Sequence, residues 1–283
     1  MQRLFDHILV PVGFNRNTNF LMEKAIQAAN HFGCDIHLLH VCTNYLPFSV
    51  FFDGYFSAPA FFNTEDRARH KMKKLVSKYR RRLREGLLLD ASIRSGSWDV
   101  QMKELIITRH INLVMIPRHK KKFFGALLHE VNVNELSLQS QCPILTVTRD
   151  FDVQHLQNIV VPVNDFLPLR KLSVATRLAS QFNGMIHLMG HRSNRYAEDK
   201  RNVKYLTMAY QLLRDYADVK VYCSSKEGKN VADDTLAYAT HICADLIVVN
   251  SGKESVLKGW FSRWFRNYLY KRSAIPVLTI APK

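Results

Sequence analysis

Small and basic side chains directly follow two short apolar segments of the chain, and such side chains can bind an anion. After residues 113–116 come Arg118 and a run of lysines that begins at Lys120. After residues 246–249 come Asn250, Ser251, Gly252, Lys253 and Lys258. Cations beside a flexible backbone can hold a phosphate or another anion, although a solvated basic loop would have the same composition. The second segment is the better candidate, because it keeps small residues as well as charge.

The twelve histidines and five cysteines do not indicate a metal centre or a catalytic nucleophile. The histidines have no carboxylate or cysteine beside them at ligand spacing, and the cysteines form no C-x-x-C pair. No P-loop, nucleophile elbow or paired-carboxylate motif can be placed in the sequence. We therefore expect no catalytic residues, no metal ligands and a protein that is not an enzyme.

The elements that would position these residues occur twice. HILVPV at 7–12 returns as NIVVPV at 158–163, and QCPILTV at 141–147 returns as AIPVLTI at 274–280. INLVMIP at 111–117 likewise returns as ADLIVVN at 244–250. An internal repeat of this length indicates two related domains, which we place at 1–150 and 151–283. The joint at about 148–157 has no Gly- or Pro-rich spacer, so the halves are expected to pack together.

Each half is predicted to alternate strands with helices. Apolar, β-branched runs predict strands at 3–12, 36–41, 87–93, 113–116 and 144–147, and again at 159–163, 186–189, 219–223, 246–249 and 277–280. Helical periodicity predicts helices after Asn17 or Thr18, near 64–84, 98–110 and 126–139, and near 169–182, 198–216, 231–242 and 259–272. This order predicts an α/β fold with two five-stranded, mainly parallel sheets and helices on both faces.

At these residues the chain resembles a tandem universal stress protein. ILVPV at the first strand, LVMI and DLIVV at the fourth strands, and CPILTV and IPVLTI at the last strands carry the resemblance in order, twice. It implies two Rossmann-like (adenine nucleotide alpha hydrolase-like) domains that pair through their last strands as a pseudo-dimer. It also implies ATP binding through a Gly-x2-Gly-x9-Gly-Ser/Thr loop after the fourth strand, with an Asp after the first.

The chain departs from that pattern at every glycine of the loop. The three positions hold Pro117, Lys120 and Glu130 in the first half, and Asn250, Lys253 and Arg263 in the second. The Asp position holds Gly13 in one half and Asn164 in the other, where Asp165 follows. Without glycine, backbone amides cannot approach phosphates closely.

These departures predict a non-enzymatic stress-response protein with a regulatory or interaction role, degenerate ATP-binding loops and no cofactor. The alternative is ATP or another adenine nucleotide in the second half. There Val163, Asn164 and Asp165 would flank the base and ribose, and Ser251, Gly252 and Lys253 the phosphates.

Two aromatic segments are candidates for an interface. Residues 45–62 read as a long loop that includes Phe48, Phe51, Phe52, Tyr55 and Phe56, and the last long helix carries Trp260, Trp264, Phe265 and Tyr268. If all of these rings were exposed, they would form a large apolar patch. We therefore expect them to pack against another surface. Packing within the chain or in a homodimer is the first option, and a protein partner, a ligand or a lipid surface are the others.

The net charge of +16 divides evenly between the halves and includes a very basic segment at 64–84. A solvated amphipathic helix is the default interpretation of this segment, and anion or nucleic-acid binding is a second alternative function. No apolar run reaches the about 18 residues of a membrane span, and no signal-peptide core follows Met1. We expect a cytoplasmic protein without a transmembrane segment.

Overall fold

The computed structural model describes residues 3–42, 59–118, 132–193, 195–228, 230–252 and 275–282. Its first half contains β1 (His7–Pro11), α1 (Arg16–Phe32), β2 (Asp35–Cys42), α2 (Pro59–Arg80), β3 (Leu89–Ser95), α3 (Trp98–Thr108), β4 (Leu113–Pro117), α4 (Val133–Ser140) and β5 (Ile144–Val147). A short helix, η3 (Val153–His155), leads into the second half. That half contains β6 (Asn158–Val163), α5 (Leu169–Gln181), β7 (Met185–Arg192), α6 (Tyr196–Tyr216), β8 (Lys220–Glu227), α7 (Val231–His241), β9 (Leu246–Asn250) and β10 (Val277–Ile280).

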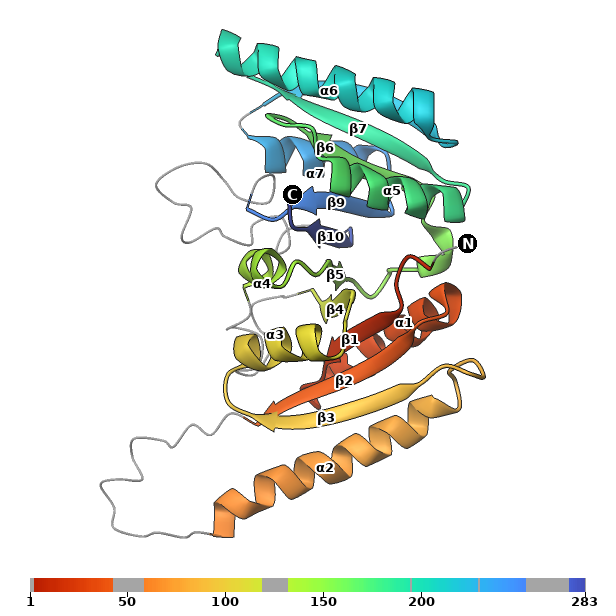
Figure 1. Ribbon diagram of the computed structural model, residues 1–283, viewed down its shortest axis with the longest axis vertical. Coiled ribbons are helices and arrows are strands. Elements are labelled where there is room, and N and C mark those ends of the chain that lie inside the picture. The colour runs from red at the N-terminus through yellow and green to blue at the C-terminus, as the bar shows by residue number, and fades with distance from the viewer. Residues whose placement is uncertain are drawn as a thin grey trace, which may run out of the picture.

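All of these strands join one sheet, in the order β3-β2-β1-β4-β5-β10-β9-β6-β7-β8 (Figure 1). Neighbouring strands are parallel except at the centre, where β5 and β10 are antiparallel. Each half therefore repeats the same strand order outward from the centre. The predicted fold class, a Rossmann-like α/β architecture with a mainly parallel sheet, is confirmed.

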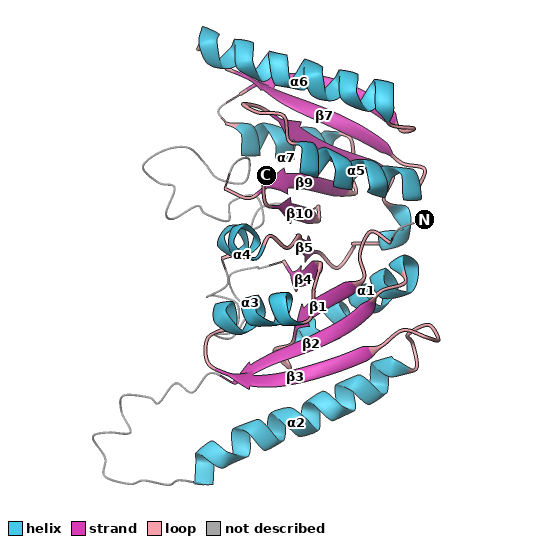
Figure 2. Ribbon diagram, viewed as in Figure 1, coloured by secondary structure: helices cyan, strands magenta, loops and turns pink. Residues whose placement is uncertain are grey.

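The helices cover both faces of the sheet (Figure 2). Apolar side chains of α1, α2, α5 and α6 pack into one buried cluster, and those of α3, α4 and α7 pack into another. Helix α1 illustrates how a helix packs on the sheet, because its apolar residues recur at helical spacing and are all buried: Leu21, Ala25, Ala28 and Phe32. Tight helix packing on both faces explains why the strands read as continuous apolar runs.

The two halves contact each other well beyond the central strand pair. Leu278 of β10 lies opposite Leu145 of β5, and Phe151, in the joint, is buried in the same cluster as residues of both halves. On the α1 and α5 side, the His31 ring stacks on Phe182 with ring centroids 4.5 Å apart. The expectation that the halves pack against one another agrees with these contacts.

Most predicted elements are found, with small differences at their ends. The prediction that Asn17 or Thr18 caps the first helix was wrong, because Asn15 is the N-cap and its side chain accepts a hydrogen bond from the backbone N–H of Asn17. Thr18 instead bonds back to the backbone N–H of Asn15, which completes a capping box. The described part of the helix predicted at 126–139 begins at Val133. The helix predicted at 259–272 lies outside the described residues.

Candidate functional site

In an open parallel sheet, ligands bind outside the carboxyl ends of the strands, where the strand order reverses. Here that reversal lies between β1 and β4 in the first half, and between β6 and β9 in the second. We call these two places the first and second carboxyl edges.

Strand register shows which residues are equivalent at the two edges. Pro11 pairs with Leu39 in the first half, and Pro162 pairs with Met189 in the second. It follows that Phe14 corresponds to Asp165 and His40 to Gly190. Trp98 and Val231 also correspond, since each is the first residue of the helix that follows the third strand. Three aromatic residues of the first half thus correspond to an aspartate, a glycine and a valine in the second.

The first carboxyl edge is occupied by its own rings, which we call the aromatic cluster: Phe14, His40 and Trp98. The Phe14 and His40 ring centroids lie 4.6 Å apart, and those of His40 and Trp98 lie 6.3 Å apart. Nδ1 of His40 is 2.7 Å from the carbonyl oxygen of Val12, at the end of β1. Trp98 is fully buried. The aromatic cluster thus joins a residue of β2 to residues that follow β1 and β3 at this edge.

Burial makes His40 sensitive to pH. It lowers the pKa of His40 below its ordinary value of 6.5, more than the hydrogen bond to Val12 raises it, and the charge of Lys71 lowers it further. The folded protein therefore holds His40 neutral at a pH where the unfolded chain already binds a proton. Burial lowers the pKa of His37 and His187 in the same direction.

We expect the contribution of His40 to the free energy of unfolding to be constant above about pH 6.5 and to fall as the pH drops below it, because the unfolded state then binds more protons. Urea titrations at several pH values would measure this. Replacing His40 with glutamine, which cannot titrate, should make the fall shallower between pH 7 and pH 5. An unchanged slope in this variant would contradict the assignment of part of the effect to His40.

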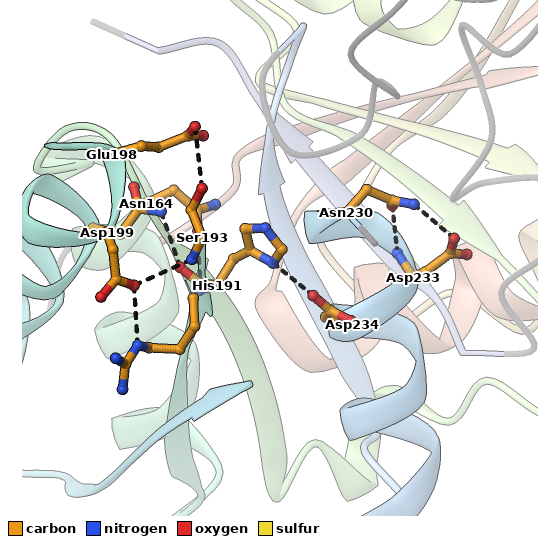
Figure 3. Close-up of polar contacts among 10 residues, drawn as sticks. Asn164, His191, Ser193, Glu198, Asp199, Asn230, Asp233 and Asp234 are labelled. Atoms are coloured by element: carbon orange, nitrogen blue, oxygen red, sulfur yellow. Dashed lines mark hydrogen bonds and ion pairs between the residues drawn. The ribbon is translucent and has the colours of Figure 1, made fainter. Parts of the chain in front are cut away.

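The second carboxyl edge is polar and has no equivalent rings. Nδ1 of His191 lies 2.6 Å from Oδ2 of Asp234, and only 11% and 7% of these side chains are exposed. The backbone N–H of His191 donates to Oδ1 of Asn164 at 3.3 Å. The backbone carbonyl of His191 accepts a hydrogen bond from the side chain of Asn202 on α6 at 2.9 Å. We call these four residues the polar cluster; Figure 3 shows the His191 ring directed at Asp234 on α7.

The polar cluster fixes the histidine tautomer. A carboxylate only accepts, so Nδ1 carries the proton that Asp234 binds, and Nε2 of neutral His191 is left as an acceptor. The backbone beside Asp234 is adapted to it as well. A Cβ at Gly228 would lie 1.8 Å from Oδ1 of Asp234, so only glycine fits there. The pair has no signature in the sequence, because its members lie 43 positions apart and neither belongs to a motif.

The sheet brings together the predicted residues of the second half. Val163 and Asn250 end the strands β6 and β9, which are neighbours. Asn164 is buried and Asp165 is partly exposed. Ser251 is 1% exposed, and its backbone N–H donates to the carbonyl of Ile280. Lys253 and Lys258 lie outside the described residues.

The amide groups that begin both loops are engaged within the protein. The N–H of Arg118 donates to Val147 in the first half, as that of Ser251 donates to Ile280 in the second. The next N–H, of Gly252, lies 3.4 Å from Oδ1 of Asn134 on α4. These backbone N–H groups therefore donate to other parts of the protein and do not point toward a site for a phosphate.

The predicted first-half residues line the other edge. Pro117 ends β4, and Gly13 lies between Val12 and the aromatic cluster. Arg118 is partly buried, and burial lowers the pKa of its guanidinium. Lys120 lies outside the described residues. Of the basic residues that follow β4, the structure describes Arg118.

One further cation lies below the second carboxyl edge. Lys171 of α5 is fully buried, and its ammonium group donates to the carbonyl of Pro162 on β6. Its equivalent in the first half is Leu21 of α1, which is buried as well but apolar. No pattern in the sequence indicates this buried cation, because Lys171 lies in a helix with an ordinary amphipathic pattern.

A comparison with protein families decides the classification. The sequence profile of the universal stress protein family matches residues 4–148. The chain belongs to the universal stress protein family. No curated protein sequence matches closely enough to count as a relative.

Solved structures of universal stress proteins share this fold across both halves. A universal stress protein from Archaeoglobus fulgidus DSM 4304 superposes with a TM-score of 0.69 at 17% identity, covering 99% of this chain and 98% of that one. A putative universal stress protein from Pseudomonas aeruginosa UCBPP-PA14 gives 0.63 at 15% identity, covering 98% and 94%. At such low identity the likeness concerns the fold.

The candidate interface residues of this universal stress protein cannot be placed. Phe48, Phe51, Phe52, Tyr55 and Phe56 lie outside the described residues, and so do Trp260, Trp264, Phe265 and Tyr268. The pairing of last strands takes place inside the chain, where β5 and β10 each have a neighbour on both sides. In the part of the chain that the structure describes, no helix is long and apolar enough to cross a membrane.

Proposed function

We propose that this chain is a tandem universal stress protein with a regulatory or interaction role, in which ATP binding has been lost from the first half. Its second half, which the family profile does not cover, is on this proposal a second domain of the same family. The repeated strand order supports this. So do the matching hydrogen bonds from Arg118 to Val147 and from Ser251 to Ile280.

The aromatic cluster is the observation that carries the proposal. Phe14, His40 and Trp98 contact one another at the first carboxyl edge, and moving a fully buried tryptophan out of its site would expose a large apolar surface. Proline at position 117 also restricts the backbone that would have to surround phosphates. The first half is therefore unsuited to a nucleotide.

The proposal includes no enzymatic step and no cofactor. Within the described residues, no group of three histidine, cysteine or acidic side chains is arranged to hold a metal ion. Burial raises the pKa of Cys34 and of Cys142 to about 12, which keeps both thiols protonated and poorly nucleophilic. Buried, protonated thiols also suit the proposed cytoplasmic location. Association of two chains through the aromatic segment 45–62 remains part of this proposal.

A second candidate function is adenine-nucleotide binding at the second carboxyl edge. The observation that favours it is the replacement of the three rings by Asp165, Gly190 and Val231. Asp165 would bind the ribose and His191 could accept a hydrogen bond through Nε2. Against it, the position next to Gly190 is filled by Leu206, whose Cδ2 lies 2.7 Å from where a Cβ would be.

Native mass spectrometry and calorimetry with ATP separate the two functions. Under the main proposal the purified chain has the mass of the protein alone, and millimolar ATP does not change its unfolding temperature. A ligand present at about 100 times its dissociation constant would stabilise the fold by about 2.7 kcal/mol, which calorimetry detects.

Equivalent variants in the two halves would locate any binding. If ATP binds at the second edge, replacing Asp165 with alanine should abolish it and replacing Phe14 with alanine should leave it unchanged. Binding that is lost only in the Phe14 variant would contradict both functions, because it would place the nucleotide at the first edge.

A further inference from the structure

Helix α2 and the turn after it form a continuous cationic surface at one end of the sheet. Residues 65–84 carry ten basic and two acidic side chains, a net charge of +8 and half of the +16 of the whole chain. All ten basic side chains are exposed: Arg67, Arg69, Lys71, Lys73, Lys74, Lys78, Arg80, Arg81, Arg82 and Arg84. We call them the α2 basic face. Figure 1 shows α2 beyond β3, at the opposite end from α6.

Helical spacing explains how the basic face is presented. Ala68, Met72, Leu75 and Tyr79 are buried, so that stripe packs against the sheet and fixes the helix in place. The positions between them point outward. Arg67 and Lys74 are seven residues apart, about two turns, and so lie on one side of α2, and Arg81 directly follows the end of the helix.

Internal partners neutralise little of this charge. Arg69 bonds to Glu65 at 2.5 Å and Arg82 approaches Glu23 at 3.5 Å, both at the surface where such pairs are weak. The side chains of Arg67, Lys73, Lys74 and Arg81 make no hydrogen bond or ion pair with any described residue. These four cations are therefore available to an external anion.

The composition of the surface indicates the class of anion. Between residues 65 and 84, all of which the structure describes, no large apolar side chain is exposed. A helix that lies on a membrane inserts an apolar face, but in residues 65–84 that face is buried against the sheet. Protein interfaces are depleted in lysine and centred on apolar or aromatic residues. A dense row of Lys and Arg with no apolar centre is instead typical of phosphate-backbone binding.

The equivalent helix of the second half lacks this charge. Helix α6 carries four basic and three acidic side chains, a net charge of +1. It also exposes Tyr196 (81%) and Tyr216 (85%) at its two ends. The basic face is therefore a property of α2, and not one that the fold demands of this helix.

We propose that the α2 basic face binds nucleic acid through its phosphate backbone, without reading base sequence. Lys71 of this face lies 5.8 Å from the centre of the Phe14 ring, but the inference does not depend on the proposed function, because it rests on Arg67, Lys73, Lys74 and Arg81. Contacts from four cations predict that log K falls with log salt with a slope of about −3.6 on duplex DNA, or roughly 150-fold between about 50 and about 200 mM salt. Duplexes of different sequence should bind equally.

Two variants of equal net charge test the proposal. The first replaces Arg67, Lys73, Lys74 and Arg81 with glutamine. The control replaces Lys200, Arg201, Lys220 and Lys226, exposed cations of α6 and β8, and both variants go from +16 to +12. Fluorescence anisotropy with labelled duplex DNA and with RNA of the same length would be measured for the full chain.

The proposal expects the α2 variant to lose at least about tenfold in affinity at low salt and most of its salt slope, with the control within about twofold of the wild type. Circular dichroism should show both variants folded. Equal losses in both variants would overturn it, since binding would then follow total charge. Phosphatidylserine vesicles that displace the DNA more effectively than unlabelled duplex, at equal concentration of negative charge, would overturn it in favour of a membrane surface.

Discussion

Replacing Leu278 with lysine is expected to destabilise the whole chain by about 4 kcal/mol or more, because it places an unpaired charge in the centre of the molecule. Leu278 is 2% exposed, lies on β10 opposite Leu145, and is held between β5 and β9. The ammonium group has no route to water there. Since the buried cluster around Leu278 contains residues of both halves, we expect both to unfold together. Differential scanning calorimetry would measure the shift.

The control makes the same change on the surface. Leu88 is 55% exposed, and replacing it with lysine should change stability by less than about 0.5 kcal/mol. The wild type should show a single calorimetric transition. Two well-separated transitions, with only the second half affected by the Leu278 variant, would show that the central strand pair does not couple the halves.

Replacing Trp98 with alanine is expected to cost about 3 to 5 kcal/mol, the usual range for removing a buried tryptophan. Trp98 is 0% exposed, and its indole N–H has no hydrogen-bond partner among the described residues. Its stabilising effect is therefore apolar. Replacement by phenylalanine keeps most of that contact and removes an unsatisfied donor, so it should cost far less than replacement by alanine.

The equivalent position in the second half provides the comparison. Val231 begins α7 as Trp98 begins α3, but it is partly exposed. Replacing it with alanine should cost about 1 kcal/mol or less. Urea denaturation of the three variants would give the differences. A similar cost for Trp98 and Val231 would contradict the view that the first carboxyl edge is a packed part of the core.

The sequence predicted the strands well because their physics is local. A parallel strand covered on both faces must be a short apolar run, and HILVPV and NIVVPV are such runs. Helix ends were predicted less well, since capping depends on the path of the loop before the helix. Asn15 caps α1 because the chain turns at Phe14, where φ is +50°, and no pattern in the sequence shows that turn.

The candidate site was predicted only in part. The repeat located the residues that end β6 and β9, because strand ends follow directly from strand positions. The contacts of Phe14 with His40, and of His191 with Asp234, depend on how separate elements approach each other at the sheet edge. Neither pair has a spacing that periodicity would reveal.

The unlike residues at the two edges have a consequence for how such a protein can change. Two identical chains that associate as a dimer must carry every substitution twice, so a ring that fills one subunit fills its copy as well. Here Trp98 and Val231 are encoded separately within one polypeptide. One side can become part of the packed core while the other keeps polar side chains, and neither change constrains the other.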